Sequence, residues 1–189
     1  MTDKEKQRNG ELYNPTASDI CKMREQGTKL VNEFNSCKDS KKQMEILKQL
    51  FGSIGTNVRV NRPFVTDFGC HTFIGNDTVI NINCTFLDAA DIKIGNRVLI
   101  GPDVKLYTTF HPLHTDERFR TSKEGNYYLT QAKSIVIEDD TWICGNVTIV
   151  PGVHIGKNVV IGAGSVVTKD IPDHVIAAGN PCKVIRKNK

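Results

Sequence analysis

Two histidines, His111 and His114, flank a Pro-Leu pair in a polar and aromatic stretch between Leu106 and Ile137. A histidine that titrates near neutral pH can accept a proton from a hydroxyl and return it to a leaving group, which is general acid–base catalysis. This chemistry makes His111 a candidate general base for a reaction at a hydroxyl. The residues alone leave a second interpretation open, in which both are solvated loop histidines without a chemical role.

The six cysteines are widely spaced and form no Cys-x-x-Cys pair. This spacing argues against a zinc knuckle and against a thioredoxin-type motif, so we expect reduced thiols that mostly pack in the interior. Cys144 has no neighbouring basic partner that would activate it as a nucleophile, and we expect it to pack as well.

Apolar residues recur at every sixth position through much of the chain. One series is β-branched throughout: Ile137, Ile143, Ile149, Ile155, Ile161 and Val167. An earlier series has the same period, slips by two residues and resumes: Phe68, Ile74, Ile80 and Phe86, then Ile94, Ile100 and Leu106. A period of six fits neither a helix nor a simple strand, whereas three short strands that close a triangular coil repeat in this way. The repeat therefore predicts that residues 68–170 wind into a parallel β-helix, with an ordinary β-sandwich as the alternative.

Two other segments frame the coil. Residues 17–52 carry two helical patterns, with apolar residues three to four positions apart, and predict a helical cap or lid. The repeat lapses between Leu106 and Ile137 for longer than a tight corner requires, and ordered insertions of this length are usually functional. We predict an all-β fold with an N-terminal helical cap, residues 1–55, and a β-helix, residues 56–189, which carries an inserted active-site loop at 107–134 and a C-terminal tail.

Composition and charge argue against several classes of partner. The formal net charge of +4 is small for 189 residues, and basic residues cluster only in the tail at Lys183, Arg186, Lys187 and Lys189, which disfavours nucleic acid. The start of the chain is too polar for a secretory signal, and no stretch is apolar over the ~18 residues that a spanning helix needs. We expect a cytoplasmic protein without a membrane partner.

Several strings, in a fixed order, carry a resemblance to one enzyme family: GELYN, the hexad array, TTFHPLH, IGAGSVVTKDIP and AAGNPCKVIRK. Together they resemble the maltose and galactoside O-acetyltransferases of the left-handed β-helix acyltransferase superfamily. The resemblance implies acetyl-CoA as co-substrate without a metal, a sugar or similar hydroxyl acceptor, and a homotrimer with its sites in clefts between neighbouring coils. It alone implies a left-handed coil, since most parallel crossovers are right-handed.

The resemblance also implies site residues. The histidine before proline in this loop is the family's catalytic base, which corresponds to His111 and would deprotonate the acceptor in a ternary complex. The backbone N–H of Gly145 would meet the tetrahedral oxyanion. The implied acetyl-CoA contacts are Gly145, Ala163, Thr168, Lys169, Lys183 and Arg186, whose cations suit phosphate groups. The implied acceptor contacts are Arg24, Asp67, Asn81 and Asp88, whose polar groups suit sugar hydroxyls.

The sequence departs from the galactoside branch at two positions. Pro15 stands where that branch has an aspartate, and Ala89 follows Asp88 where that branch repeats the aspartate. The inserted loop is also longer by several residues. A galactoside acceptor is therefore not implied, and serine or a hydroxylated antibiotic stays open as the acceptor.

Two alternatives from other classes stay open as well. A zinc carbonic anhydrase on the same coil would need three histidines from neighbouring subunits, and His71, His111 and His114 are the available ones. A non-catalytic β-helix would serve only as an assembly scaffold, and measurable acetyl-CoA binding would exclude that role.

Overall fold

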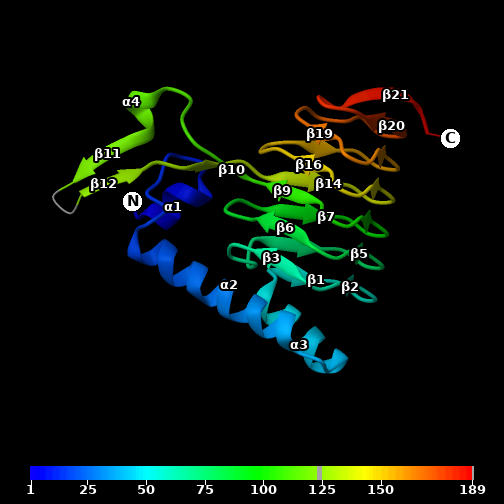
Figure 1. Cartoon of the computed structure of the whole chain (residues 1–189), viewed down its shortest axis with the longest axis horizontal. Coiled ribbons are helices and arrows are strands. Elements are labelled where there is room, and N and C mark those ends of the chain that lie inside the picture. Colours follow the sequence, from blue (N-terminus) through cyan, green and yellow to red (C-terminus); the bar gives the residue numbers. More distant parts are fainter. Residues whose placement is uncertain (123–124, 189) are drawn as a thin grey trace.

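The computed structural model describes residues 1–122 and 125–188. Helices near the N-terminus lead into a parallel β-helix of about six turns, and an inserted segment projects from the side of the coil near the N-terminus (Figure 1). The helices are α1 (Asp3–Arg8), α2 (Ser18–Ser36), α3 (Ser40–Leu50) and, within the insertion, α4 (Thr115–Arg118). Among the described residues, no helix is both long and apolar enough to cross a membrane.

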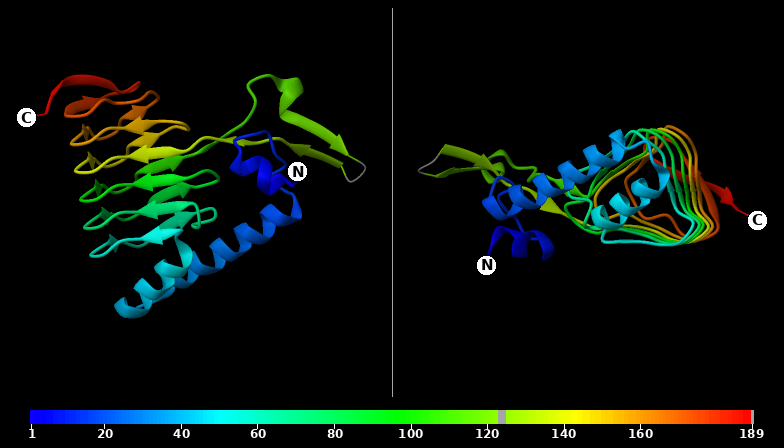
Figure 2. Two further views of the ribbon diagram at one scale, coloured as in Figure 1. Left: turned by 180° about the vertical axis from the view of Figure 1, so that it is seen from behind. Right: turned by 90° about the horizontal axis from the view of Figure 1, so that it is seen from below.

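Three sheets form the sides of the coil, and the turns superpose when the coil is seen end-on (Figure 2). The first sheet contains β1 (Ser53–Ile54), β4 (Thr72–Ile74), β7 (Ile92–Ile94), β14 (Ile135–Ile137) and β17 (His154–Ile155). The second contains β2 (Arg59–Val60), β5 (Val79–Ile80), β8 (Leu99–Ile100), β15 (Trp142–Ile143), β18 (Val160–Ile161), β20 (Val175–Ala178) and β21 (Lys183–Lys187). The third contains β3 (Phe64–Thr66), β6 (Cys84–Leu87), β9 (Lys105–Tyr107), β16 (Thr148–Ile149) and β19 (Val166–Val167).

Neighbouring strands in these sheets pair in parallel, with the antiparallel pair of β20 and β21 at one end as the exception. The predicted left-handed parallel β-helix is confirmed.

The six-residue period corresponds to the inward columns of the coil. Ile137 and Ile143 are 1 % and 0 % exposed and stack in register on Ile94 and Ile100 of the preceding turn. Every predicted inward position from Ile74 to Val167 is buried. Stiff β-branched side chains fill such a column well because few rotamers are lost on burial.

Phe68, predicted as the first inward position, is an exception. It lies outside the strands, between two bends, and packs with Tyr13 and Ala132 in a second, smaller cluster. Early turns pair residues 20 apart, as in Ile54 with Ile74, whereas late turns pair residues 18 apart. The additional residues lie at the corner after the third sheet, so counting six back from Ile74 reaches a corner residue.

Helices α2 and α3 cover the first turn of the coil. α2 and α3 confirm the two predicted helical patterns, and Phe34, Leu47 and Leu50 belong to the same buried cluster as the coil. β1 already pairs with β4, so the coil starts inside the segment that the sequence assigned to the cap, residues 1–55. α1 was not predicted, although Thr2 and Glu5 form a capping box at its start.

The insertion forms an antiparallel arm, described over residues 108–122 and 125–134. β10 (Thr109–Phe110) pairs with β13 (Gln131–Ala132) at the base, and β11 (Phe119–Ser122) pairs with β12 (Gly125–Tyr128) farther out. The arm leaves the coil at the corner after the third sheet, which we call the insertion corner. The corner after the second sheet is called the glycine corner and comprises residues 81–83, 101–103, 144–146 and 162–164.

Candidate active site

His111 follows β10 directly, and the returning side of the arm holds its imidazole. Nδ1 lies 2.8 Å from the carbonyl oxygen of Leu129. Because a carbonyl only accepts hydrogen bonds, Nδ1 carries the proton and Nε2 presents its lone pair. The ring of Tyr128 meets the imidazole edge-on, with centroids 5.4 Å apart and planes at 82°. His111 is therefore an oriented side chain whose Nε2 can accept a proton.

His111 lines a hollow of about 130 Å³, which we call the His111 pocket. Its walls come from the N-terminal segment, α2, the insertion corner and the arm. The lining residues are Tyr13, Pro15, Arg24, Asp67, Thr109, His111, Tyr128 and Thr130. The fold thus brings together Arg24, Asp67 and His111, three predicted site residues that are far apart in the sequence.

Arg24 is held beside Asp67 by three contacts. Its Nε lies 3.7 Å from Asp67 Oδ1, and a terminal guanidinium nitrogen donates to the Pro15 carbonyl at 3.2 Å. The guanidinium also lies over the Phe68 ring, 5.2 Å from its centroid. Burial raises the pKa of the Asp67 carboxyl, and the Arg24 charge opposes that rise. A carboxylate kept available in this way is suited to accept a hydrogen bond from a hydroxyl.

Asp88, in contrast to Asp67, is buried and makes contacts that stabilise the coil. It is 0 % exposed, and its carboxylate accepts hydrogen bonds from the Thr66 hydroxyl at 2.8 Å and the Thr72 hydroxyl at 3.1 Å. The backbone amides of Phe68 and His71 also donate to it, at 2.9 and 3.3 Å. These donors satisfy both oxygens and tie neighbouring turns together. A carboxylate bound in this way is not free to contact an acceptor, so this chain gives no support to the implied acceptor role of Asp88.

Asn81 lies outside the His111 pocket, at the glycine corner, where it shares an edge with Gly145 and Ala163. Gly101 approaches Gly145 so closely that a Cβ on Gly101 would lie 2.7 Å from the Gly145 nitrogen. The Gly164 amide donates to the Gly145 carbonyl at 3.0 Å. Around Gly101, Gly145 and Ala163 this edge therefore consists mainly of backbone, and a slender extended ligand can lie along it.

The remaining predicted acetyl-CoA contacts lie in the last turns. Thr168 and Lys169 follow β19 at the insertion corner, and Lys183 and Arg186 lie on β21. All four are exposed. The predicted general base and oxyanion donor therefore lie at two different corners of one chain, with His111 at the insertion corner and Gly145 at the glycine corner.

The surroundings of Cys144 and His71 fit a structural role for both residues. Burial raises the pKa of the Cys144 thiol, which does not favour the thiolate that a nucleophile needs. His71 is buried, and its Nδ1 donates to the Asp88 carbonyl at 2.8 Å. Within residues 1–122 and 125–188, no three His, Cys, Asp or Glu side chains converge as metal ligands.

Sequence reasoning missed several groups that complete the His111 pocket. Tyr13 is 1 % exposed, and burial raises the pKa of its hydroxyl, so this group stays protonated at neutral pH. Its backbone amide donates to the Thr130 carbonyl at 2.9 Å, which places Thr130 in the pocket. The GELYN string includes Tyr13 and could have indicated it. Leu129 contributes a backbone carbonyl, for which the sequence holds no signal.

Known proteins match the chain along nearly its whole length. Residues 6–55 match the family described as the maltose acetyltransferase hexapeptide capping motif, and residues 134–169 match the bacterial transferase hexapeptide family (six repeats). The chain is 42 % identical over 180 residues to a galactoside O-acetyltransferase of Lactococcus lactis, which covers 94 % of this chain and 84 % of that protein. It is 41 % identical over 181 residues to a putative acetyltransferase of Saccharomyces cerevisiae, covering 94 % and 89 %.

Solved structures extend this similarity to three dimensions. A maltose O-acetyltransferase from Clostridium difficile superposes with a TM-score of 0.92 at 41 % identity, covering 100 % of this chain and 98 % of that one. A galactoside acetyltransferase in complex with coenzyme A gives 0.89 at 38 % identity, covering 100 % and 92 %. A Vibrio cholerae hexapeptide-repeat acetyltransferase complexed with acetyl coenzyme A gives 0.90 at 38 % identity, covering 100 % of both chains. With sequence and fold in agreement along its whole length, the chain belongs to the maltose and galactoside O-acetyltransferases, a branch of the hexapeptide-repeat acyltransferases.

Proposed function

We propose that this protein is an acetyl-CoA-dependent O-acetyltransferase that acetylates a hydroxyl of a sugar or related small acceptor, with His111 as general base. The observation that carries the proposal is the hydrogen bond from His111 to the Leu129 carbonyl, which leaves Nε2 available in a pocket that also holds Asp67 and Arg24. Relatives bound to acetyl-CoA and to CoA support the identity of the acyl donor.

The reaction is a direct transfer in a ternary complex. His111 Nε2 takes the proton of the acceptor hydroxyl while the hydroxyl oxygen attacks the thioester carbonyl. The tetrahedral oxyanion receives a hydrogen bond from the Gly145 N–H, which has no hydrogen-bond partner among the described residues. Collapse breaks the carbon–sulfur bond, and the His111 imidazolium returns the proton to the departing thiolate. These steps require no metal.

The division between two corners supports a homotrimer. The His111 pocket and Gly145 lie at different corners of one coil. In a closed three-fold assembly, the insertion corner of one subunit can face the glycine corner of the next, which joins base and oxyanion donor in one cleft. Sedimentation or light scattering that gives a monomer at working concentration would remove the shared site.

The pocket favours an acceptor other than a galactoside. Pro15 and Ala89, which replace two aspartates of the galactoside branch, are both buried and offer no carboxylate. Polar recognition in the His111 pocket therefore falls to Asp67 and Arg24. We place the enzyme in the cytoplasm, because acetyl-CoA is an intracellular metabolite.

The experiment that tests the function is an acceptor panel followed by release of free CoA thiol. Glucosides, maltose, galactosides, serine and hydroxylated antibiotics are incubated with acetyl-CoA and purified enzyme without added metal. We expect turnover on a sugar. A preference for serine would move the protein to another branch of the superfamily, and no turnover on any acceptor would favour a scaffold.

A further inference from the structure

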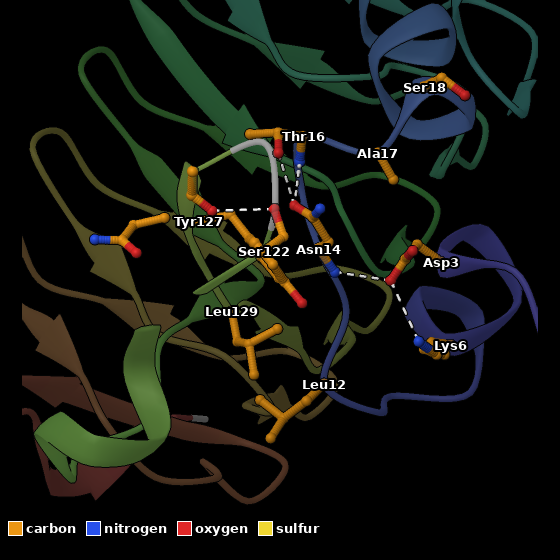
Figure 3. Close-up of a pocket in the computed structure, with 12 residues that line it drawn as sticks. Asp3, Lys6, Leu12, Asn14, Thr16, Ala17, Ser18, Ser122, Tyr127 and Leu129 are labelled. Atoms are coloured by element: carbon orange, nitrogen blue, oxygen red, sulfur yellow. Dashed lines mark hydrogen bonds and ion pairs between the residues drawn. The ribbon is translucent and has the colours of Figure 1, made fainter. Parts of the chain in front are cut away.

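A two-stranded wall separates the His111 pocket from a larger hollow. Tyr13 and Thr130 form an isolated antiparallel bridge and exchange backbone hydrogen bonds of 2.9 and 3.0 Å, with a turn following at residues 15 and 16. Successive residues of an extended segment point to opposite faces. The front face lines the His111 pocket with Tyr13, Pro15, Tyr128 and Thr130. The back face lines the second hollow, here called the back pocket, with Leu12, Asn14, Thr16, Tyr127 and Leu129 (Figure 3).

The back pocket is much the larger of the two. Its volume is about 540 Å³, against about 130 Å³ for the His111 pocket. At about 30 Å³ per water molecule, the back pocket has room for about 18 waters and the His111 pocket for about four. Asp3 and Lys6 of α1 and Ser18 at the start of α2 close its other sides. This volume lies within the usual range for small-molecule sites.

The lining offers hydrogen bonds without net charge. Asp3 and Lys6 form an ion pair with each other at 3.5 Å, and Asp3 Oδ1 also accepts from the Asn14 amide at 2.9 Å. The Asn14 carboxamide oxygen accepts from Thr16, whereas its Nδ2 and the Tyr127 hydroxyl have no hydrogen-bond partner among the described residues. Leu129 adds an apolar surface. Free amide and hydroxyl donors beside an apolar surface match a carbohydrate, which has many hydroxyls, apolar ring faces and no charge.

Leu129 connects the two pockets. Its side chain lines the back pocket, while its carbonyl oxygen holds His111 Nδ1 at 2.8 Å. A ligand that packs against the Leu129 side chain therefore acts on the residue that orients the imidazole. No other contact needs to carry the coupling.

We propose that the back pocket binds a carbohydrate as a second ligand, separate from the acceptor, and that its occupancy acts on His111 through Leu129. The binding site stands on its own geometry, whereas the effect on catalysis rests on the proposed function. Leu129 is then a positioning residue, because it acts through His111.

The test of binding uses the full chain, titrated with maltose and without acetyl-CoA, and followed by backbone amide NMR. We expect shifts at Asn14 and Tyr127 that saturate. Thr16→Trp, which places a large ring beside Asn14 in the back pocket, should abolish them, whereas Ser36→Trp at the exposed far end of α2 should not. The absence of these shifts, or their survival in Thr16→Trp, would overturn the site.

A milder variant protects the test against a folding defect. Tyr127→Phe removes one hydroxyl and should raise the Kd for maltose about fivefold, the effect of one net hydrogen bond. Tyr107→Phe, at the end of β9 and outside both pockets, is the matched control and should leave the Kd unchanged. Equal affinities in the two variants would contradict the proposal.

The coupling has its own readout. Maltose is itself a candidate acceptor and can move the His111 imidazole resonances from the His111 pocket, so the coupling is the additional, saturable movement that the wild type shows and Thr16→Trp lacks. Maltose should also change kcat for glucose, measured at saturating glucose, at least twofold and only in the wild type. Binding without movement of the His111 resonances would overturn the coupling. If no acceptor is turned over at all, the proposed function fails, but the amide shifts still decide whether the back pocket is a site.

Discussion

The insertion corner and the glycine corner of the same coil have opposite designs. At the insertion corner the chain departs from the six-residue period. It adds two residues in the early turns and the whole arm in a later turn, and these additions supply Asp67, Asp88 and His111. At the glycine corner the period is kept, and Gly101 and Gly145 approach each other through backbone atoms.

The difference shows how a strict repeat acquires chemistry. Additions to the repeat bring polar side chains and a place to orient them, because the added residues do not have to fill the core. A corner that keeps the repeat can hold small residues such as Gly101, Gly145 and Ala163, whose backbone suits a long thin ligand. Changes to His111 at the first corner should therefore lower turnover, and changes to the glycines at the second should lower affinity for acetyl-CoA, to which Thr168 and Lys169 at the first corner also contribute.

The largest expected effect is on His111. His111→Ala should lower kcat by about 10²- to 10⁴-fold, the value of positioned general-base catalysis, with acetyl-CoA binding nearly unchanged. His114→Ala is the matched control from the same loop and should have a much smaller effect, since its exposed side chain lies outside the His111 pocket. Steady-state kinetics of both variants shows which histidine is the general base. A more damaging His114→Ala would move the base to that histidine.

Asp88 tests whether a side chain at the insertion corner can be purely structural. Asp88→Asn replaces a charged acceptor of four hydrogen bonds and should lower the free energy of unfolding by about 1–3 kcal/mol, measured by urea denaturation. The KM for the acceptor should stay close to that of the wild type. A large rise in KM with unchanged stability would restore Asp88 to the acceptor site.

Two glycine substitutions test the other corner. Gly145→Ala meets its nearest neighbour, the Pro102 carbonyl, at an ordinary 3.4 Å, so folding should be preserved while the added methyl raises the KM for acetyl-CoA about tenfold. Gly101→Ala would press on the Gly145 backbone and should cost about 1–3 kcal/mol of stability. Kinetics and thermal unfolding of the pair separate the two effects. A Gly145→Ala enzyme with unchanged KM would exclude this edge from acetyl-CoA binding.

The smallest expected effect concerns the charge pair at the insertion corner. Arg24→Met removes the cation that opposes the rise in the pKa of Asp67, so this pKa should rise further above its ordinary value. The sign follows from burial: a carboxyl with a raised pKa in the folded state favours folding at low pH, and this contribution is lost as the pH rises through that pKa. Carboxyl carbon NMR measures the change, and Lys93→Met, beside the half-buried Asp91, is the control. No further rise in Arg24→Met would show that Arg24 does not act on Asp67.

The sequence by itself indicated the coil, because large apolar residues recur with a six-residue period from Ile74 to Val167 and all of them are buried in the inward columns. It also indicated the two cap helices, and family strings pointed to His111. Tertiary structure decided what no local pattern encodes. Phe68 left the core column for a corner, and Asp88 turned inward to four donors. The carbonyl that orients His111 belongs to Leu129, a backbone group far along the arm. These outcomes depend on how the corners pack against each other. The residues that meet there are not regularly spaced in the sequence, so no sequence pattern predicts the contacts.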